Sequence, residues 1–227
     1  MKKITIVIDG PAGAGKSTVS QRLAKRLHYL YLDTGALYRA IALAAHQKNI
    51  PPKNSKKLYK LCCQCRISFK KMKGKQKVYL NGKDVTSALR ISPMGLLASH
   101  YSKLPLVRKA LLWHQRKFGE KGGIVAEVRD LGTVVFPKAE LKFFLVASLK
   151  ERAKRRYLEL LKKDKQRSLN EIEKEIQKRD QQDRERELAP LKKAKDAIEL
   201  DTTTMTIDQV VEEMYKQVIL SAKREGS

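Results

Sequence analysis

The residues with the clearest capacity for chemistry form one short run near the start of the chain. Gly10, Gly15, Lys16 and Ser17 occupy every fixed position of the pattern G-x-x-x-x-G-K-[ST]. In that pattern glycines let backbone N–H groups turn toward phosphates, the lysine bridges the β- and γ-phosphates, and the hydroxyl serves Mg²⁺. We therefore expect a nucleoside triphosphate, ATP, to bind here. The residues expected to hold it are Gly10, Pro11, Ala12, Gly13, Ala14, Gly15, Lys16, Ser17 and Thr18.

The sequence around this run supplies the structural context that the pattern requires. Apolar, mostly β-branched residues over 4–8 predict a buried strand, and apolar positions spaced by four over 17–27 predict a helix. A phosphate-binding loop between a strand and a helix does not by itself separate a kinase from an ATPase or a GTPase. The chain has no N-K-x-D sequence of the kind that reads guanine, and the strand expected at 124–126 is a weak match to the acidic strand of motors and helicases.

A second candidate site follows the strand expected at 29–32. Asp33, Thr34 and Gly35 come directly after that strand, where an open α/β sheet binds ligands at its carboxyl edge. Arg39 would lie one turn into the next helix, and its guanidinium could fork onto a phosphate. Taken alone, the same residues are equally compatible with a turn and a surface arginine.

The order of the expected elements predicts an α/β fold. Further strands are expected at 142–147 and 197–200, and further helices at 36–45, 95–118, 149–161, 169–187 and 207–220. Strands that alternate with helices indicate a parallel sheet covered on both faces. Residues 66–86 differ, because two strand-like segments and the turn residues Asn81 and Gly82 predict an antiparallel insertion.

Charge and cysteine content limit the classes of partner. Lys and Arg number 49 and Asp and Glu 24, so the net charge is +25, and residues 53–121 alone hold 18 basic and 2 acidic residues. Such a field attracts anions, including nucleotides and nucleic acid. The three cysteines, Cys62, Cys63 and Cys65, cannot form a disulfide framework and indicate reduced thiols in the cytoplasm. No apolar stretch is long enough to cross a membrane.

Three segments, together with the phosphate-binding run, resemble the bacterial cytidylate kinases. They are the run from Asp33 to Arg39, the run Arg129-Asp130-Leu131-Gly132-Thr133-Val134-Val135-Phe136-Pro137, and the run from Arg179 to Arg184. The resemblance extends from about residue 4 to 218. It implies a P-loop NTPase three-layer fold with a five-stranded parallel sheet, a small antiparallel insert in the nucleoside monophosphate-binding region and a helical lid. The single domain 1–227 would comprise a core (1–62, 95–150 and 188–227), the insert (63–94) and the lid (151–187).

The resemblance also implies an activity and a set of roles. Members of that family move the γ-phosphoryl group of ATP to CMP or dCMP with Mg²⁺. The implied catalytic residues are Lys16, Arg129 and the lid arginine Arg156, with Ser17 at the metal. The implied CMP-binding residues are Thr34, Arg39, Ser99, Arg108, Arg129, Asp130, Arg179, Asp183 and Arg186. A cytoplasmic monomer whose partners are ATP and CMP or dCMP, with no nucleic-acid or membrane partner, would follow.

One departure from the family pattern affects the metal side of the site. Glu127 and Val128 stand where the family usually has Asp-Gly, and a β-branched residue cannot easily replace a glycine at positive φ. Within the lid, three arginines, Arg152, Arg155 and Arg156, are candidates to reach the phosphates, and the sequence does not choose among them. Two other readings stay open: another small-molecule or nucleotide P-loop kinase, and a basic nucleic-acid-binding ATPase, which residues 53–121 would favour.

Overall fold

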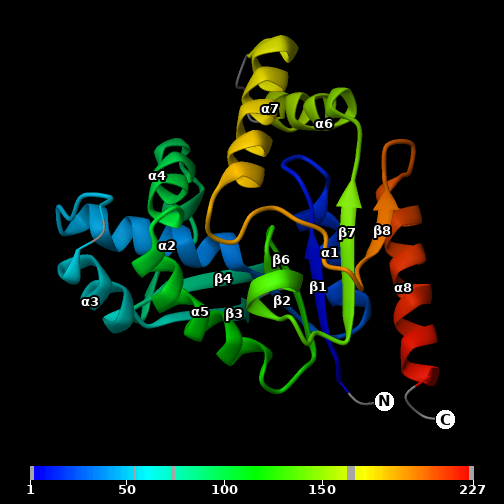
Figure 1. Cartoon of the computed structure of the whole chain (residues 1–227), viewed down its shortest axis with the longest axis horizontal. Coiled ribbons are helices and arrows are strands. Elements are labelled where there is room, and N and C mark those ends of the chain that lie inside the picture. The colour runs from blue at the N-terminus through cyan, green and yellow to red at the C-terminus, as the bar shows by residue number, and fades with distance from the viewer. Residues whose placement is uncertain (1–2, 54, 73–74, 163–166, 225–227) are drawn as a thin grey trace. The chain divides into compact units, whose positions relative to one another are not determined.

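The chain is described here by a computed structural model that covers residues 3–53, 55–72, 75–162 and 167–224. It contains two compact units, which we call the first unit (residues 1–31 and 121–227) and the second unit (residues 32–120). Together they include the expected five-stranded sheet, the small antiparallel sheet and the pair of helices predicted as a lid (Figure 1). The sheet follows the order β2-β6-β1-β7-β8.

The central strand of the large sheet leads into the phosphate-binding run. The strands are β1 (Thr5–Asp9), β2 (Leu30–Asp33), β6 (Ile124–Glu127), β7 (Leu141–Val146) and β8 (Ile198–Asp201). Strand β1 pairs in parallel with β6 on one side and β7 on the other, and all five of its residues are buried. A continuous apolar run suits a strand that is covered on both faces. Because parallel strands end at one edge, Asp9 and Glu127 are brought to the same edge of the sheet.

The helices of the first unit have two separate tasks. They are α1 (Lys16–Arg26), α6 (Leu149–Leu161), α7 (Leu169–Glu185) and α8 (Ile207–Arg224). Helices α1 and α8 bury Leu23 and Met214 in one core with the sheet. Helices α6 and α7 share a smaller core around Ala153 and Ile176 and lie beyond the carboxyl ends of β1 and β7 (Figure 1). The predicted capping box at Ser168 is present at the start of α7.

The second unit is built around a helical core and the antiparallel insert. Its helices are α2 (Thr34–Gln47), α3 (Lys56–Gln64), α4 (Ser92–Ser102) and α5 (Pro105–Gly119), with a short 3₁₀ turn at Ala88–Arg90. Its strands are β3 (Ile67–Met72), β4 (Lys75–Leu80) and β5 (Lys83–Asp84), which form an antiparallel sheet. Asn81 and Gly82 both have positive φ between β4 and β5, as the predicted hairpin turn requires.

Two helix predictions in the second unit were wrong or incomplete. The single helix expected over 95–118 is two helices, because Leu104 is extended and Pro105 begins α5. Proline disfavours helical geometry in the preceding residue and fits the first turn of a new helix. Helix α3 was not predicted. Its start is marked by Ser55, whose hydroxyl accepts the Leu58 N–H at 3.1 Å, and by its buried face around Leu61.

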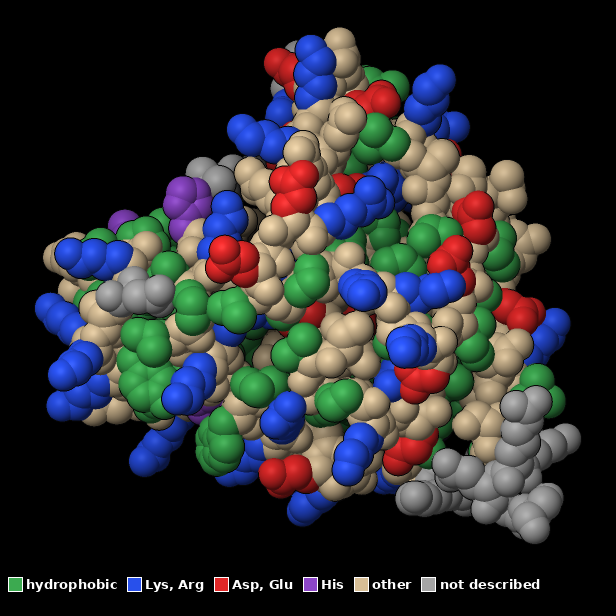
Figure 2. All heavy atoms as spheres, viewed as in Figure 1, with side chains coloured by type: hydrophobic (Ala, Val, Ile, Leu, Met, Phe, Trp, Pro, Cys, Tyr) green, Lys and Arg blue, Asp and Glu red, His purple; other side chains and the backbone are tan. Residues whose placement is uncertain are grey.

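The surface reflects the basic composition. Lys and Arg side chains are spread over the face shown in Figure 2, with fewer Asp and Glu side chains between them. In the part of the chain that the structure describes, no helix combines the length and apolar character that crossing a membrane requires.

We predict that two glycines with positive φ differ in their tolerance of alanine. At Gly82 a Cβ would meet nothing within 4 Å, so Gly82→Ala should cost only the left-handed backbone penalty, about 1–2 kcal/mol. At Gly122, which precedes β6, a Cβ would collide with the Lys3 carbonyl oxygen, so Gly122→Ala should cost more. Urea unfolding of both variants measures the two losses. Equal losses would contradict the predicted collision at Gly122.

Candidate functional site

The phosphate-binding run forms the loop that its sequence predicts. Gly10, Gly13 and Gly15 all have positive φ, and Gly15 is the N-cap of α1. These conformations let the loop turn tightly and leave backbone N–H groups at the helix N-terminus, where an anion is stabilised. The Lys16 ammonium donates to the Pro11 carbonyl oxygen at 2.7 Å, so in the free protein this side chain lies over its own loop.

Burial makes the Lys16 ammonium unusually acidic. Lys16 is buried, and desolvation, followed by repulsion from Arg129, lowers its pKa to about 7. Arg179 adds further repulsion, while Glu127 and Asp9 oppose the shift. The pKa of Arg179 is itself lowered to about 10, mainly by repulsion from Arg129. We call Lys16, Arg129 and Arg179 the cation cluster; within it, Arg129 lowers the pKa of both Lys16 and Arg179.

The acid at the end of β6 reaches the loop hydroxyl. Ser17 Oγ donates to Glu127 Oε1 at 2.6 Å, and the Tyr31 hydroxyl donates to the same oxygen at 3.0 Å. Glu127 is buried, so these bonds hold its carboxylate in one place. A hydroxyl and a carboxylate are hard oxygen donors of the kind that Mg²⁺ prefers. The donor set therefore fits a metal bound mainly by phosphate oxygens and water.

The unusual Val128 is accommodated without strain. Among the described residues other than glycine, positive φ occurs at His28, Asn49, Asn81 and Ala189, so Val128 has an ordinary backbone conformation. Its N–H donates to the Ile8 carbonyl oxygen at 3.3 Å, which continues the pairing of β6 with β1. A glycine is not needed at this position, and the longer Glu127 side chain still reaches Ser17.

A buried aspartate holds the loop that follows β6. Asp9 accepts the N–H groups of Leu131 and Gly132 at 3.0 and 2.8 Å. Burial raises the pKa of Asp9 to about 6, although both N–H donations oppose the rise. At Gly132 a Cβ would approach an Asp9 carboxylate oxygen to 3.3 Å, so a side chain there would crowd this contact. Asp9 thus fixes the start of the turn at Leu131–Val135, directly after Arg129 and Asp130.

Residues predicted for the acceptor nucleotide meet at the end of α7. Arg129 forms an ion pair with Asp183, and the Arg186 guanidinium lies 3.5 Å from both Asp183 and Asp130. Asp130 is buried, whereas Arg179 is exposed and its pKa is lowered mainly by the charge of Arg129. Carboxylates alternating with guanidiniums present both acceptors and donors, which a polar ring or a sugar hydroxyl can satisfy.

The three lid arginines have different surroundings. Arg152 is buried and bonded to backbone and to Asp180. Arg155 donates to Thr202 Oγ1 at 3.1 Å and to Glu151 at 2.9 Å. Arg156 is exposed, pairs with Glu159 at 2.7 Å and contributes to the lowered pKa of Arg179. Arg156 is therefore the lid arginine with the clearest link to the cation cluster.

The other predicted acceptor residues belong to the second unit. Asp33 caps α2 by accepting the Ala36 N–H at 3.0 Å, and its second oxygen accepts from Arg39 at 2.6 Å. Arg108 donates to the Ser102 carbonyl oxygen at 3.1 Å and lies over the Tyr38 ring at 5.7 Å. Thr34 is buried at the start of α2, and Ser99 is half-buried on α4, where its carbonyl accepts from Ser102.

The sequence missed residues that act through backbone contacts. Asp9 and Arg152 bond loop backbone and Tyr31 bonds the Glu127 side chain, yet none of the three belongs to a recognised motif; Asp180, which bonds Ala12, lies within the run from Arg179 to Arg184 but has no role that the resemblance implies. Arg152 was considered only as a phosphate ligand. The acidic end of β1, directly before Gly10, was the one signal that could have identified Asp9.

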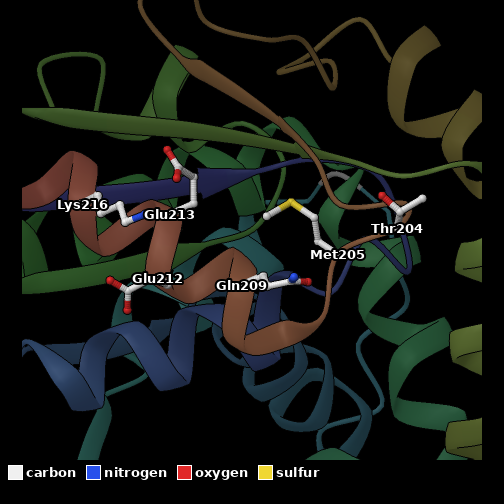
Figure 3. A pocket seen from close by; sticks show the side chains of 6 residues that line it. All are labelled: Thr204, Met205, Gln209, Glu212, Glu213 and Lys216. Atoms are coloured by element: carbon white, nitrogen blue, oxygen red, sulfur yellow. The ribbon is translucent and has the colours of Figure 1, made fainter.

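A hollow on α8 is unrelated to these residues. It has a volume of about 340 Å³ and is lined by Thr204, Met205, Gln209, Glu212, Glu213 and Lys216 (Figure 3). Two carboxylates against one ammonium do not favour phosphates. None of the predicted site residues lines it.

Comparisons with known proteins agree with the motifs. The family model described as "Cytidylate kinase" matches residues 6–219. A cytidylate kinase of Syntrophotalea carbinolica is 47% identical over 231 residues, covering 100% of this chain and 98% of that protein. A cytidylate kinase of Bacillus cytotoxicus is 47% identical over 210 residues, covering 92% of this chain and 93% of that protein. An uncharacterized protein from Eubacterium ventriosum has a similar fold, with a TM-score of 0.51 and 13% identity. The match covers 96% of this chain and 98% of that protein.

We predict that a triphosphate binds to this loop with proton uptake. At pH 8, above the Lys16 pKa of about 7, most free protein carries a neutral Lys16, and bound phosphates should restore its charge. Titration calorimetry in buffers of different ionisation enthalpy should show uptake approaching about one proton per bound triphosphate at pH 8. Lys16→Arg, which keeps its charge, should abolish the uptake. A buffer-independent enthalpy for the unmodified protein would contradict the neutral Lys16.

Proposed function

The chain belongs to the cytidylate kinase family, whose reaction transfers the γ-phosphoryl group of ATP to CMP or dCMP, and we propose how its residues perform that reaction. The observation that carries the proposal is the cation cluster. Burial and the charge of Arg129 lower the pKa of Lys16, Arg129 also lowers the pKa of Arg179, and phosphates among these cations would make the arrangement favourable. Phosphoryl transfer depends on such positioning and charge neutralisation.

The donor nucleotide is assigned to the loop at 10–18. Its N–H groups and the N-terminus of α1 bind the phosphates, and Lys16 exchanges its bond to Pro11 for the β- and γ-phosphates. Arg156, on the helix pair above the sheet edge, is proposed to add charge to the transferred group. Excluding water at this stage limits hydrolysis of ATP.

The metal is assigned to the pair formed by Ser17 and Glu127. Mg²⁺, when bound with ATP, neutralises phosphate charge and orients the transferred group. Ser17 would be the protein ligand, and Glu127 would orient the Ser17 hydroxyl and the metal's water molecules. Tyr31 keeps the Glu127 carboxylate directed at Ser17. The described residues include no cluster of three or more His, Cys, Asp or Glu that could hold a metal alone, which is consistent with a metal held largely by phosphates.

The acceptor nucleotide is assigned to the residues that the family resemblance implies. Arg39 is proposed to hold the CMP phosphate, with Thr34 at the start of the same helix. Ser99, Arg108 and Asp130, with Arg186 beside Asp130, are assigned to the cytosine, which offers both hydrogen-bond acceptors and an amino donor. Arg179 and Asp183 are assigned to the sugar, and Arg129 lies between the two phosphate positions.

The cellular setting forms part of the proposal. We propose a cytoplasmic monomer whose partners are ATP and CMP or dCMP. Cys62, Cys63 and Cys65 are free, which suits a reducing compartment.

The direct test measures ADP release with CMP, dCMP, UMP and AMP as acceptors. CMP and dCMP should give far higher kcat/KM than UMP and AMP, and Lys16→Met should abolish transfer to all four. Preference for another acceptor would favour a different nucleotide kinase. ADP release independent of acceptor would favour an ATPase.

Asp130→Asn should separate acceptor binding from donor binding. The amide cannot reproduce the carboxylate that faces Arg186, so we expect the KM for CMP to rise about tenfold or more while the KM for ATP changes less than about twofold. Steady-state kinetics with each substrate varied measures the split. Asp208→Asn, on the exposed face of α8, serves as the matched control and should leave both constants unchanged. Equal changes in both constants for Asp130→Asn would remove it from the base site.

Glu127→Gln should weaken the metal-dependent part of donor binding. Binding of a non-hydrolysable ATP analogue is compared with Mg²⁺ and with EDTA. The increase in affinity for the analogue that Mg²⁺ produces should fall by about tenfold, as for other residues that support a metal ligand. The affinity measured in EDTA should stay within about twofold of that of the unmodified protein. Tyr31→Phe keeps the carboxylate and should have a smaller effect. An unchanged gain in Glu127→Gln would exclude Glu127 from the metal site.

A further inference from the structure

An ion pair between the two lid helices is bonded to the backbone of the phosphate-binding loop. Asp180, on α7, accepts the Ala12 N–H at 3.0 Å, and Arg152, on α6, donates to the Ala12 carbonyl oxygen at 2.8 Å. Arg152 and Asp180 also pair with each other, and Arg152 Nε donates to the Ala147 carbonyl oxygen at 3.0 Å. Both polar backbone groups of Ala12 are thus bonded to one ion pair.

The packing leaves the loop little freedom to move independently of the helices. The side chains of Arg152 and Asp180 are each 7% exposed. A Cβ at Gly13 would approach the Arg152 Cβ to 3.0 Å, so the loop backbone lies directly against α6. Ala12 packs into the core that α6 and α7 share, beside Ile172 and Ile176. A buried, fully bonded ion pair is costly to break, because a lone charge would remain in a dry environment.

Helix α7 carries both sets of contacts along one face. Ile172, Ile176 and Asp180 are spaced by four residues, are buried and face α6 and Ala12. Arg179 and Asp183 continue the same face of α7, at i+7 and i+11 from Ile172, and Asp183 pairs with Arg129, next to the acceptor residue Asp130. One helix therefore contacts the donor loop and residues assigned to the acceptor.

We propose that Asp180 and Arg152 are positioning residues that couple donor binding to acceptor binding through helix α7. The inference rests on the proposed function. ATP fixes the loop at 10–17, and the loop fixes Asp180 and hence the register of α7. The register of α7 sets where Arg179 and Asp183 meet the acceptor. Because binding coupling is reciprocal, CMP must tighten ATP binding by the same factor.

The experiment is a double-ligand cycle. Calorimetry measures the affinity of a non-hydrolysable ATP analogue with and without saturating CMP, and the affinity of CMP with and without the analogue. In the unmodified protein each ligand should tighten the other by about fivefold or more. Asp180→Asn keeps an oxygen for the Ala12 N–H but loses the charge that holds Arg152. This variant should bring the coupling to within about twofold of none while CMP alone binds normally.

Two further variants keep the test decisive. Asp208→Asn removes a carboxylate from an exposed ion pair on α8 and should leave the coupling intact. Arg152→Lys keeps the charge but cannot serve Ala12, Ala147 and Asp180 together, so it should reduce the coupling as Asp180→Asn does. If neither site variant folds, hydrogen exchange on the unmodified protein replaces them. CMP alone should then increase the protection of residues 10–17, and the ATP analogue alone that of α7.

The outcomes separate the two proposals. Failure to bind or phosphorylate CMP would overturn the proposed function. A protein that phosphorylates CMP but binds its two ligands independently would overturn the coupling alone. Coupling that persists in folded Asp180→Asn, or hydrogen exchange in which each ligand protects only its own site, would also overturn it.

Discussion

Electrostatic repulsion within the cation cluster is the constraint on which the rest of this structure depends. Burial, followed by the charge of Arg129, lowers the pKa of Lys16, and the charge of Arg129 lowers the pKa of Arg179. A folded protein keeps like charges together only when other interactions fix them there. Phosphate groups placed among the three would remove the repulsion. The arrangement that is unfavourable in the free protein therefore favours the binding of two ligands that each carry phosphates.

The fixing interactions come from buried carboxylates at the edge of the sheet and on α7. Asp9 holds the turn after Asp130 through two N–H groups, Glu127 holds Ser17, and Asp180 holds Ala12. Each carboxylate belongs to a different element, and each bonds either the phosphate-binding run or the turn after Asp130. The carboxylates therefore bring the loops into register, and the loops in turn place the cations.

Much of this arrangement could be predicted from the sequence, and the limits have physical causes. The loop at 10–17 was predictable because its glycines and lysine have fixed spacing, and the two-residue turn at Asn81 and Gly82 because it requires positive φ. Pro105 marks in the sequence the break between α4 and α5, but residues 95–118 were predicted as one helix. The contacts of Asp180 with Ala12 join residues 168 positions apart, and no local pattern encodes them. The tolerance of Val128 depends on its pairing with Ile8, which also requires the folded sheet.

The stability of Arg179→Gln, with and without nucleotides, tests the central claim most directly. If the cation cluster is unfavourable in the free protein, this variant should unfold at a higher urea concentration than the unmodified protein. CMP with a non-hydrolysable ATP analogue should then stabilise the variant less than the unmodified protein. Arg184→Gln, on the same helix, should change neither quantity. A free Arg179→Gln protein that is less stable than the unmodified one would contradict the claim that repulsion among these cations is relieved by phosphates.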